Sequence, residues 1–244
     1  MPTSTNLAPL FSIISGIRNE PPISTSCPLD IITSFPWANS FTARWTDAAL
    51  LLTTQIILGG LVVIFQLETN LTTFHFGNAI LIFLLIYTMC KYPTNIELSS
   101  AKFFSSKATK YIIFFVIIYF QLVLGAYTRH SNAGLACPDF PTCLGYWIPP
   151  YLSETVFLHL LHRFSGILIL VYSLFLLLIT YREDIKDQFK RIGKLTLLVG
   201  VQIALGIYVV VSKLAFSMTA VHLFVALLII MIALDAVFDE NKTI

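Results

Sequence analysis

The sequence has few charged residues. Asp, Glu, Lys and Arg make up only 11% of its 244 residues, whereas 57% are hydrophobic. A soluble domain of this length needs more charge to cover its surface, so the composition indicates an integral membrane protein with lipid as its solvent. The formal net charge of +2 is too small to suggest a nucleic-acid partner. Four cysteines are too few for a disulfide scaffold, so their positions carry more information than their number.

The N-terminus lacks the basic region of a secretory signal peptide and has only a short apolar run, residues 10–17. Residues 1–46 contain six of the chain's eleven prolines. No uninterrupted apolar stretch among them reaches the length of about 20 residues that spans a bilayer. We therefore expect residues 1–46 to form an extramembrane or interfacial segment.

Long apolar runs dominate the rest of the sequence. Six of them are long enough to span a membrane, at roughly 47–66, 73–90, 109–127, 155–181, 193–211 and 217–238. The predicted fold is therefore all-α, a polytopic membrane bundle of about six transmembrane helices.

Basic residues are distributed unevenly among the connections between these runs. Loops 91–110 and 181–194 carry nine of the 15 lysines and arginines, whereas the other three loops contain only Arg129 and Lys213. The positive-inside rule then places both termini and the two basic loops on the cytoplasmic or matrix side. The long loop 128–154 is expected to face outward, from a bacterial cytoplasmic membrane or a mitochondrial inner membrane.

The sequence contains an internal repeat. The stretch QIILGGLVVIFQLETNLTTFHFGNAILI, from Gln55, aligns without gaps to QIALGIYVVVSKLAFSMTAVHLFVALLI, from Gln202, and brings His75 onto His222. QLVLG at Gln121 has the same opening. Repeats of whole helical units are common in membrane proteins. We interpret residues 109–238 as one full four-helix unit and residues 47–90 as the helix pair of an incomplete first unit.

Two histidines lie at matching depths in neighbouring predicted helices. His162 and His222 fall about eight and six residues after the starts of their helices, or roughly 9–12 Å below the outer surface. An ionisable residue inside a spanning helix is by default a functional candidate. Paired imidazoles of this kind are what a bis-histidine haem requires, with the bundle core enclosing the porphyrin. The alternative is that each histidine bonds a polar group on a neighbouring helix.

Other polar residues lie near this predicted haem site. Arg163 and Arg129 are candidates for binding the anionic haem propionates, because arginine offers them a planar and always charged fork. Arg129 could equally anchor its helix at the membrane interface. His159 lies one helical turn before His162, where it could assist proton movement or line the haem pocket. A polar residue at the helix mouth, bonded to Glu154 or water, is the slightly favoured interpretation.

The outward loop contains a pair of cysteines in the sequence ACPDFPTC. Cys137 and Cys143 would face an oxidising compartment, so a structural or redox-linked disulfide is the favoured interpretation. A thiol pair for redox exchange or metal binding is the alternative. Cys90, at the predicted inner face, is expected to be a free thiol.

These motifs together resemble the haem A synthase family. The resemblance rests on LGAYTRHSNAGLACPDFPTCLGYWIPP, FLHLLHRFSG and QIALGIYVVVSKLAFSMTAVHLF, and covers roughly 47–238. It implies two pseudo-symmetric halves, one for a haem b cofactor and one for the substrate haem O, whose methyl group is oxidised to the formyl of haem A. His162 and His222 would be the haem b ligands, Cys137–Cys143 the loop disulfide, and His75 a ligand in the substrate half.

The sequence also departs from that family pattern. The expected first half lacks its initial helix pair, its own cysteine loop and its own His-Arg motif. The family's substrate half carries a glutamate three residues before the His-Arg histidine, and His159 occupies that offset here. The catalytic residues therefore stay unassigned.

Three functions follow from these observations. The first is a haem A synthase-type oxidoreductase, acting as a homo-oligomer or with haem O synthase and oxidase assembly partners. The second is a catalytically inactive haem b-binding protein in haem handling or oxidase assembly. The third is a membrane cytochrome that transfers electrons.

Overall fold

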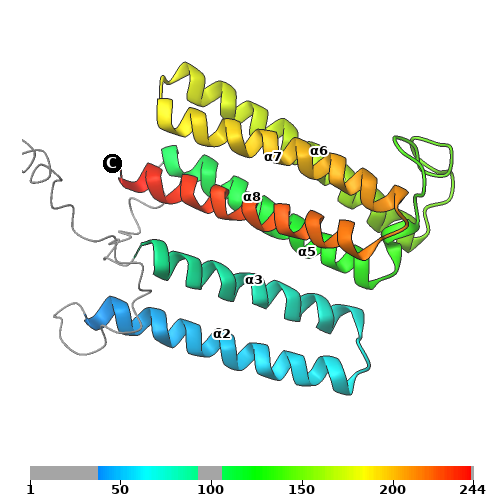
Figure 1. Cartoon of the computed structure of the whole chain (residues 1–244), viewed down its shortest axis with the longest axis horizontal. Coiled ribbons are helices and arrows are strands. Elements are labelled where there is room, and N and C mark those ends of the chain that lie inside the picture. Colours follow the sequence, from blue (N-terminus) through cyan, green and yellow to red (C-terminus); the bar gives the residue numbers. More distant parts are fainter. Residues whose placement is uncertain (1–37, 93–105, 243–244) are drawn as a thin grey trace, which may run out of the picture. The chain divides into compact units, whose positions relative to one another are not determined.

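The computed structural model describes residues 38–92 and 106–242. Six long helices account for most of this part of the chain (Figure 1). Their bounds are α2 (Ala38–Ile64), α3 (Thr69–Lys91), α5 (Ser106–His130), α6 (Glu154–Arg182), α7 (Lys186–Val211) and α8 (Phe216–Lys242), with a short 3-10 helix, η2 (Ala133–Leu135), after α5.

All six long helices contain a span that is long and apolar enough to cross a membrane, with mean hydropathy between 1.6 and 2.6. A helix satisfies every backbone donor and acceptor internally, which hydrocarbon demands of a spanning segment. The prediction of an all-α polytopic membrane bundle is therefore confirmed.

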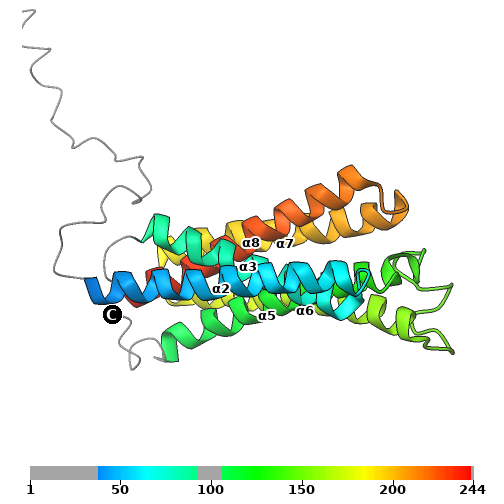
Figure 2. The same cartoon turned by 90° about the horizontal axis from the view of Figure 1, so that it is seen from below.

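Helices α5, α6, α7 and α8 form a closed four-helix bundle, because each packs against two of the others in the order α5, α6, α7, α8 and back to α5. Helices α6 and α8 thus lie diagonally across the bundle. Helix α3 packs on the outside against α5, and α2 packs on α3, as Figures 1 and 2 show from two directions. Only 6% of the apolar span of α2 is buried, against 44% for α8, so most of the apolar surface of α2 lies outside the packed helices of the described chain.

The core of the bundle lies between the four helices and is filled by apolar side chains. Tyr111, Phe114, Leu176, Leu195 and Ile230 are almost completely buried in one continuous cluster. This cluster also includes Ile80 and Leu84 of α3, so the outer pair is joined to the bundle by apolar packing.

The internal repeat extends to the turns between paired helices. Gln66 and Leu67 after α2, and Lys213 and Leu214 after α7, are consecutive residues with positive φ in equivalent positions. The Leu67 N–H donates to the Val62 carbonyl, and the equivalent Leu214 N–H donates to Val209, each at 2.8 Å. The same left-handed turn therefore reverses the chain in both copies.

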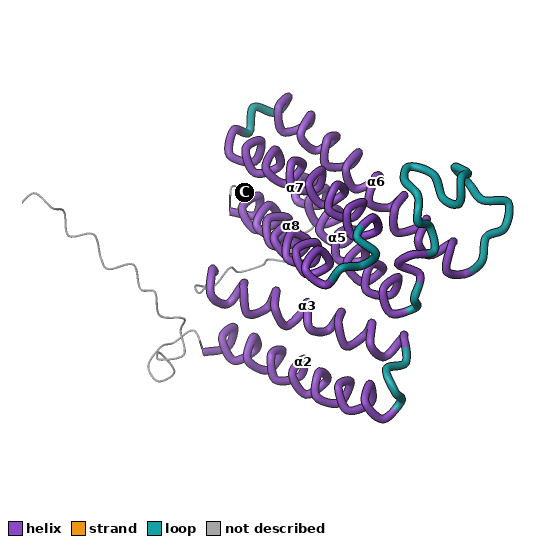
Figure 3. The backbone as a smooth tube through the Cα atoms, turned by 45° about the vertical axis from the view of Figure 1, so that its right-hand side comes forward, coloured by secondary structure: helices purple, strands orange, loops and turns teal. Residues whose placement is uncertain are grey.

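The helix connections divide between the two ends of the bundle. The turns after α2 and α7 lie at the same end as the long loop 131–153, and the α6–α7 connection lies at the other end (Figures 1 and 3). The connections after α2, α5, α6 and α7 that the structure describes therefore lie on the expected sides relative to one another. Which end faces the cytoplasm stays a prediction.

Two helices begin before the apolar stretches that the sequence predicts to span the membrane. Helix α2 begins at Ala38 rather than near residue 47, inside the predicted N-terminal segment 1–46, and α7 begins at Lys186 rather than near residue 193. Hydropathy detects only the apolar part of a helix, whereas the backbone hydrogen bonds continue through polar turns such as those of Lys186 and Lys190. The proposed unit boundaries at residues 47–90 and 109–238 stay predictions.

Candidate functional site

The predicted ligand histidines lie on the two diagonal helices of the bundle, His162 on α6 and His222 on α8. Both are partly buried. His162 follows the start of α6 by eight residues and His222 follows that of α8 by six. At about 1.5 Å per residue, both are roughly 9–12 Å from the helix ends at the loop side. The two side chains therefore lie at matching depths on the diagonal helices, and their role as ligands stays a prediction.

Each histidine rests against a glycine of the preceding helix. A Cβ placed on Gly125 would lie 3.0 Å from Cε1 of His162, and one on Gly206 would lie 3.2 Å from Cε1 of His222. These separations are tighter than ordinary contacts, so the two imidazoles occupy space that a side chain would otherwise fill. Two imidazoles held in this way on the diagonal helices are side chains of the type that would bind a haem iron.

A glutamine anchors each of these two histidines. Gln121 Nε2 donates to the His162 carbonyl at 2.9 Å and also contacts His162 Nδ1 at 3.1 Å. Ser165 Oγ donates to Gln121 Oε1 at 2.5 Å and fixes the amide from its other end. Gln202 Nε2 donates to the His222 carbonyl at 3.0 Å. Sequence reasoning missed both glutamines, although the shared QLVLG and QIALG stretches pointed to them.

His75 occupies a third position of the same kind on α3. A Cβ on Gly59 of α2 would lie 3.2 Å from its Cε1, and Gln55 Nε2 lies 3.1 Å from its Nε2. Asn78 Nδ2 donates to Gln55 Oε1 at 2.7 Å and to the Leu51 carbonyl at 2.9 Å. His75 therefore faces the α2–α3 pair, away from the bundle that holds His162 and His222.

Arg163 binds the outward loop. Its Nη1 donates to the carbonyls of Asp139 and Thr142, at 2.8 and 3.2 Å, and its Nη2 donates to the Cys137 carbonyl at 2.6 Å. Three carbonyl acceptors on one guanidinium tie the loop to the helix turn that carries His162. The predicted propionate contact stays a prediction, and the loop contacts are a function that sequence reasoning missed.

The loop that Arg163 holds is closed by a disulfide between Cys137 and Cys143, with Cα atoms 4.6 Å apart. Both cysteines are fully buried, and the favoured prediction of a disulfide is confirmed. The prediction that Cys90 is a free thiol is wrong, because Cys90 is also disulfide-bonded. Hydropathy and spacing give no information on which distant residues meet in space.

His159 is buried beneath the same loop. Its Nδ1 lies 2.9 Å from the Ala133 carbonyl and 3.3 Å from the Cys137 backbone nitrogen. Only one of the two bonds forms in a given tautomer, and the shorter separation favours donation to Ala133. A partner in Glu154 or water stays a prediction, whereas η2 folds back over the start of α6 and supplies a backbone acceptor for Nδ1 that sequence reasoning missed.

Arg129 and His130 end α5 and are exposed at the loop end of the bundle. His130 lines a cavity of about 250 Å³ between α3, α5 and α6, together with Glu68, Thr69 and Glu154. Backbone N–H groups of Leu71 and Asn70 hold the pKa of Glu68 below its usual value. Arg129 is not among the residues that line this cavity, and its propionate role stays a prediction.

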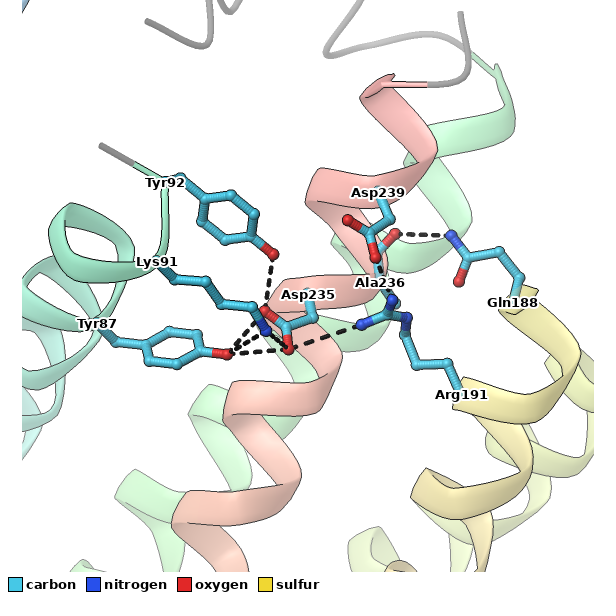
Figure 4. A network of polar contacts seen from close by, with 8 residues as sticks. All are labelled: Tyr87, Lys91, Tyr92, Gln188, Arg191, Asp235, Ala236 and Asp239. Carbon is cyan, nitrogen blue, oxygen red and sulfur yellow. Dashed lines mark hydrogen bonds and ion pairs between the residues drawn. The ribbon is translucent and has the colours of Figure 1, made fainter. Parts of the chain in front are cut away.

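The opposite end of the molecule contains a polar network around Asp235 that sequence reasoning missed (Figure 4). Asp235 accepts hydrogen bonds from Tyr87 at 2.9 Å, Tyr92 at 2.8 Å and Lys91 at 2.5 Å, all on or just after α3. Arg191 of α7 lies 3.6 Å away and also pairs with Asp239. Burial and the bond to Asp235 raise the pKa of Tyr92, so it stays a donor. An aspartate inside the last apolar run was the available signal.

Comparison with known proteins places this arrangement in a family. A model of the family described as "Cytochrome oxidase assembly protein" matches residues 29–234. The chain belongs to the haem A synthase family of cytochrome oxidase assembly proteins. It is an integral membrane protein of that family, as its fold requires.

Curated relatives carry the name haem A synthase. The chain is 33% identical to the haem A synthase of Alkalihalophilus pseudofirmus (strain ATCC BAA-2126 / JCM 17055 / OF4) over 182 residues, which cover 72% of this chain and 60% of the relative. It is 30% identical to that of Bacillus licheniformis over 183 residues, covering 70% and 58%. The match to that of Shouchella clausii (strain KSM-K16) is 33% over 132 residues, covering 52% and 44%. The chain therefore spans about half the length of the relatives it matches.

Within this haem A synthase family member, the residues that carried the resemblance gather at one end of the molecule. The disulfide loop, Arg163 and His159 contact one another, and His162 lies one turn away on the same helix. The loop residues are distant from Arg163 and His159 in the sequence, and they meet because the loop folds back onto α6.

Proposed function

We propose that the chain acts as a haem A synthase-type membrane oxidoreductase, which converts haem O to haem A for cytochrome oxidase. The observation that carries the proposal is the pair of cradled imidazoles on α6 and α8, in a chain whose curated relatives are named haem A synthase. His162 and His222 would hold haem b in the four-helix bundle through their imidazole nitrogens. When bound, the haem supplies a redox centre in the bundle.

The protein's own residues would orient and enclose that haem. Gly125 and Gly206 leave room for the imidazoles, and the disulfide loop covers the end of the bundle where they lie. Arg163 holds this cover through three carbonyls, which limits access of water to the site. Its remaining donors, and Arg129 at the rim, would meet the propionates. The loop end would face outward, with the termini and basic connections on the cytoplasmic or matrix side.

The α2–α3 pair would contribute to the haem O site through His75. The contact of the His75 ring with Gly59 repeats the contact of the His222 ring with Gly206, so the incomplete first unit holds its imidazole against a glycine in the same way. The rest of that site would come from other parts of the protein, from a second copy of the chain, or from haem O synthase and oxidase assembly partners. His75 Nε2 contacts Gln55 and must leave that contact to bind an iron.

A second function, a catalytically inactive haem b-binding protein in oxidase assembly, is favoured by His159. It occupies the offset at which the family resemblance implies a catalytic glutamate, and its ring bonds the loop backbone. A plain electron-transfer cytochrome would use the same haem b site. Neither role requires His75 to bind a second haem.

The deciding experiment is production of haem A in a host that lacks its own synthase. Extracted haems are identified by mass spectrometry from cells with the wild-type chain, with His75→Ala, and with the control Gly60→Ala, whose added methyl meets open space. Haem A in the wild type and the control, but not in His75→Ala, supports the synthase. A well-expressed wild type that carries haem b and produces no haem A supports the inactive haem-binding role instead.

A further inference from the structure

Three helices of this chain carry the same short pattern, a glutamine followed four residues later by a glycine. The pairs are Gln55 with Gly59 on α2, Gln121 with Gly125 on α5, and Gln202 with Gly206 on α7. Residues four apart lie on one helix face, so each pair presents a side-chain amide and a bare stretch of backbone to the same neighbour. In each case that neighbour is the next long helix of the chain, and the residue it places there is a histidine.

The glycine determines which edge of the histidine ring faces the preceding helix. At Gly206, an added Cβ would meet His222 Cε1 at 3.2 Å and Nδ1 at 3.8 Å, with no other atom of that ring within 4 Å among the nearest contacts. The Cε1–Nδ1 edge of the ring is therefore the part nearest α7, and Nε2 lies more than 4 Å from that Cβ position. A metal-bound histidine normally uses its second ring nitrogen to donate to a protein acceptor, which fixes the tautomer.

The hydrogen bonds of the glutamine side chain differ between Gln121 and Gln202. The residue three positions after the histidine is Ser165 on α6, where its hydroxyl holds the Gln121 amide. On α8 the equivalent residue is Val225, which has no polar group to offer. In this part of the described chain, Gln202 Oε1 is consequently buried without a hydrogen-bond partner, and so is His222 Nδ1.

These two unpartnered atoms are complementary. His222 Nδ1 carries a proton whenever Nε2 binds a metal, and Gln202 Oε1 is an acceptor with no donor. The backbone carbonyl of Gln202 also lies beside the His222 ring. A buried donor or acceptor that stays unpaired costs about 1–3 kcal/mol, so pairing the two atoms is favourable.

We propose that Gln202 and Gly206 are positioning residues for haem ligation, and that they hold the Nδ1 edge of His222 so that Nε2 faces the haem. At His162 the geometry differs, because the Gln121 amide nitrogen lies at Nδ1 and the Gly125 Cβ position is almost equally far from Nδ1 and Nε2, at 3.6 and 3.7 Å, so the inference is confined to His222. This inference rests on the proposed haem-binding function. It goes beyond the ligands themselves, because it assigns the residues that set their orientation and ring electronics.

Ordinary helix packing is a competing explanation for the glycines, since small residues allow membrane helices to approach closely. The chain contains a matched control for it. Gly200 lies on α7, one and a half turns before Gly206, and an added Cβ there would have no heavy atom within 4 Å. Gly200→Ala and Gly206→Ala therefore make the same chemical change on one helix, with and without an imidazole in the way.

The experiment uses the full chain purified in detergent, with wild type, Gly200→Ala and Gly206→Ala compared by haem content, low-spin absorption spectrum and transfer of haem to excess apomyoglobin. Size-exclusion chromatography checks that each variant is folded. We expect Gly200→Ala to match the wild type, and Gly206→Ala to hold haem about 10- to 100-fold more weakly, as loss of an outer-shell partner typically does.

Gln202 variants provide the second measurement, which applies even if Gly206→Ala does not fold. Gln202→Leu removes the acceptor oxygen and is expected to shift the haem reduction potential upward, whereas Gln202→Glu keeps an acceptor oxygen and the low-spin spectrum. If Gln202 had a purely structural role, both variants would alter folding, and the haem properties of Gln202→Leu and Gln202→Glu would not differ.

The failures are distinguishable. A folded wild type without low-spin haem overturns the proposed function and this inference together. Haem-bound wild type with unchanged retention in Gly206→Ala and an unchanged potential in Gln202→Leu overturns the inference alone.

Discussion

Replacing Asp235 with asparagine should destabilise the protein by loosening the contact between α3 and the four-helix bundle. The Asp235 side chain is only 8% exposed and receives donors from three side chains of the α3 end, namely Tyr87, Lys91 and Tyr92. Asparagine has nearly the same shape, but it removes the charge and turns one acceptor oxygen into a donor. That donor would face the cations of Lys91 and Arg191.

The magnitude follows from the exposure of each partner. A hydrogen bond to a charged group contributes about 1.5–3 kcal/mol, and the buried bond from Tyr92 is of this kind. Lys91 is 42% exposed and can turn its ammonium toward water or lipid headgroups, so its share falls to roughly 1 kcal/mol or less. We expect a total loss of about 2–3 kcal/mol, below the roughly 3–5 kcal/mol for breaking a fully buried ion pair.

The assay is unfolding in mixed micelles by increasing sodium dodecyl sulfate, followed by circular dichroism. The matched control is Glu183→Gln, which also neutralises one carboxylate of an ion pair, here with Lys110 at 2.9 Å and with Glu183 45% exposed. It should cost less than about 1 kcal/mol. Hydrogen exchange should rise in residues 80–92 of Asp235→Asn and stay unchanged in α6. An equal loss in both variants, or uniform exchange along the chain, would refute the reasoning.

Three further predictions concern the loop end of the bundle. His162→Met and His222→Met should each abolish or severely perturb the low-spin haem spectrum of the purified protein, and two unperturbed single variants would show that the ligand assignment is wrong. A non-reduced digest should contain the peptide linked through Cys137 and Cys143. Cys137→Ser should lower the free energy of unfolding by about 2 kcal/mol, the value expected for so short a closed loop. Quantitative alkylation of both cysteines without reductant would contradict the disulfide. Arg163→Lys should increase hydrogen exchange in residues 131–153, because one ammonium cannot reach three carbonyls in the planar geometry of the guanidinium; unchanged exchange would show that the loop is held by other contacts.

The sequence by itself determined the features that depend on local composition. Six apolar runs were sufficient to predict the spanning helices, because the cost of an exposed peptide group in hydrocarbon leaves a helix as the structure available to each run. The alignment of Gln55 with Gln202 predicted the repeat, and the structure extends it to the left-handed turns at Leu67 and Leu214. Cys137 and Cys143, close in sequence within one loop, were paired correctly for the same reason.

The tertiary structure alone decided which distant groups meet. The sequence placed Arg163 beside His162, but only the fold-back of the loop showed that its guanidinium binds Cys137, Asp139 and Thr142. His159 acquired a backbone partner because η2 covers the start of α6. Asp235 gathered its donors from α3 and α7, about 145 and 44 residues earlier in the chain. Such contacts depend on helix rotation and packing, which a hydropathy pattern leaves unspecified.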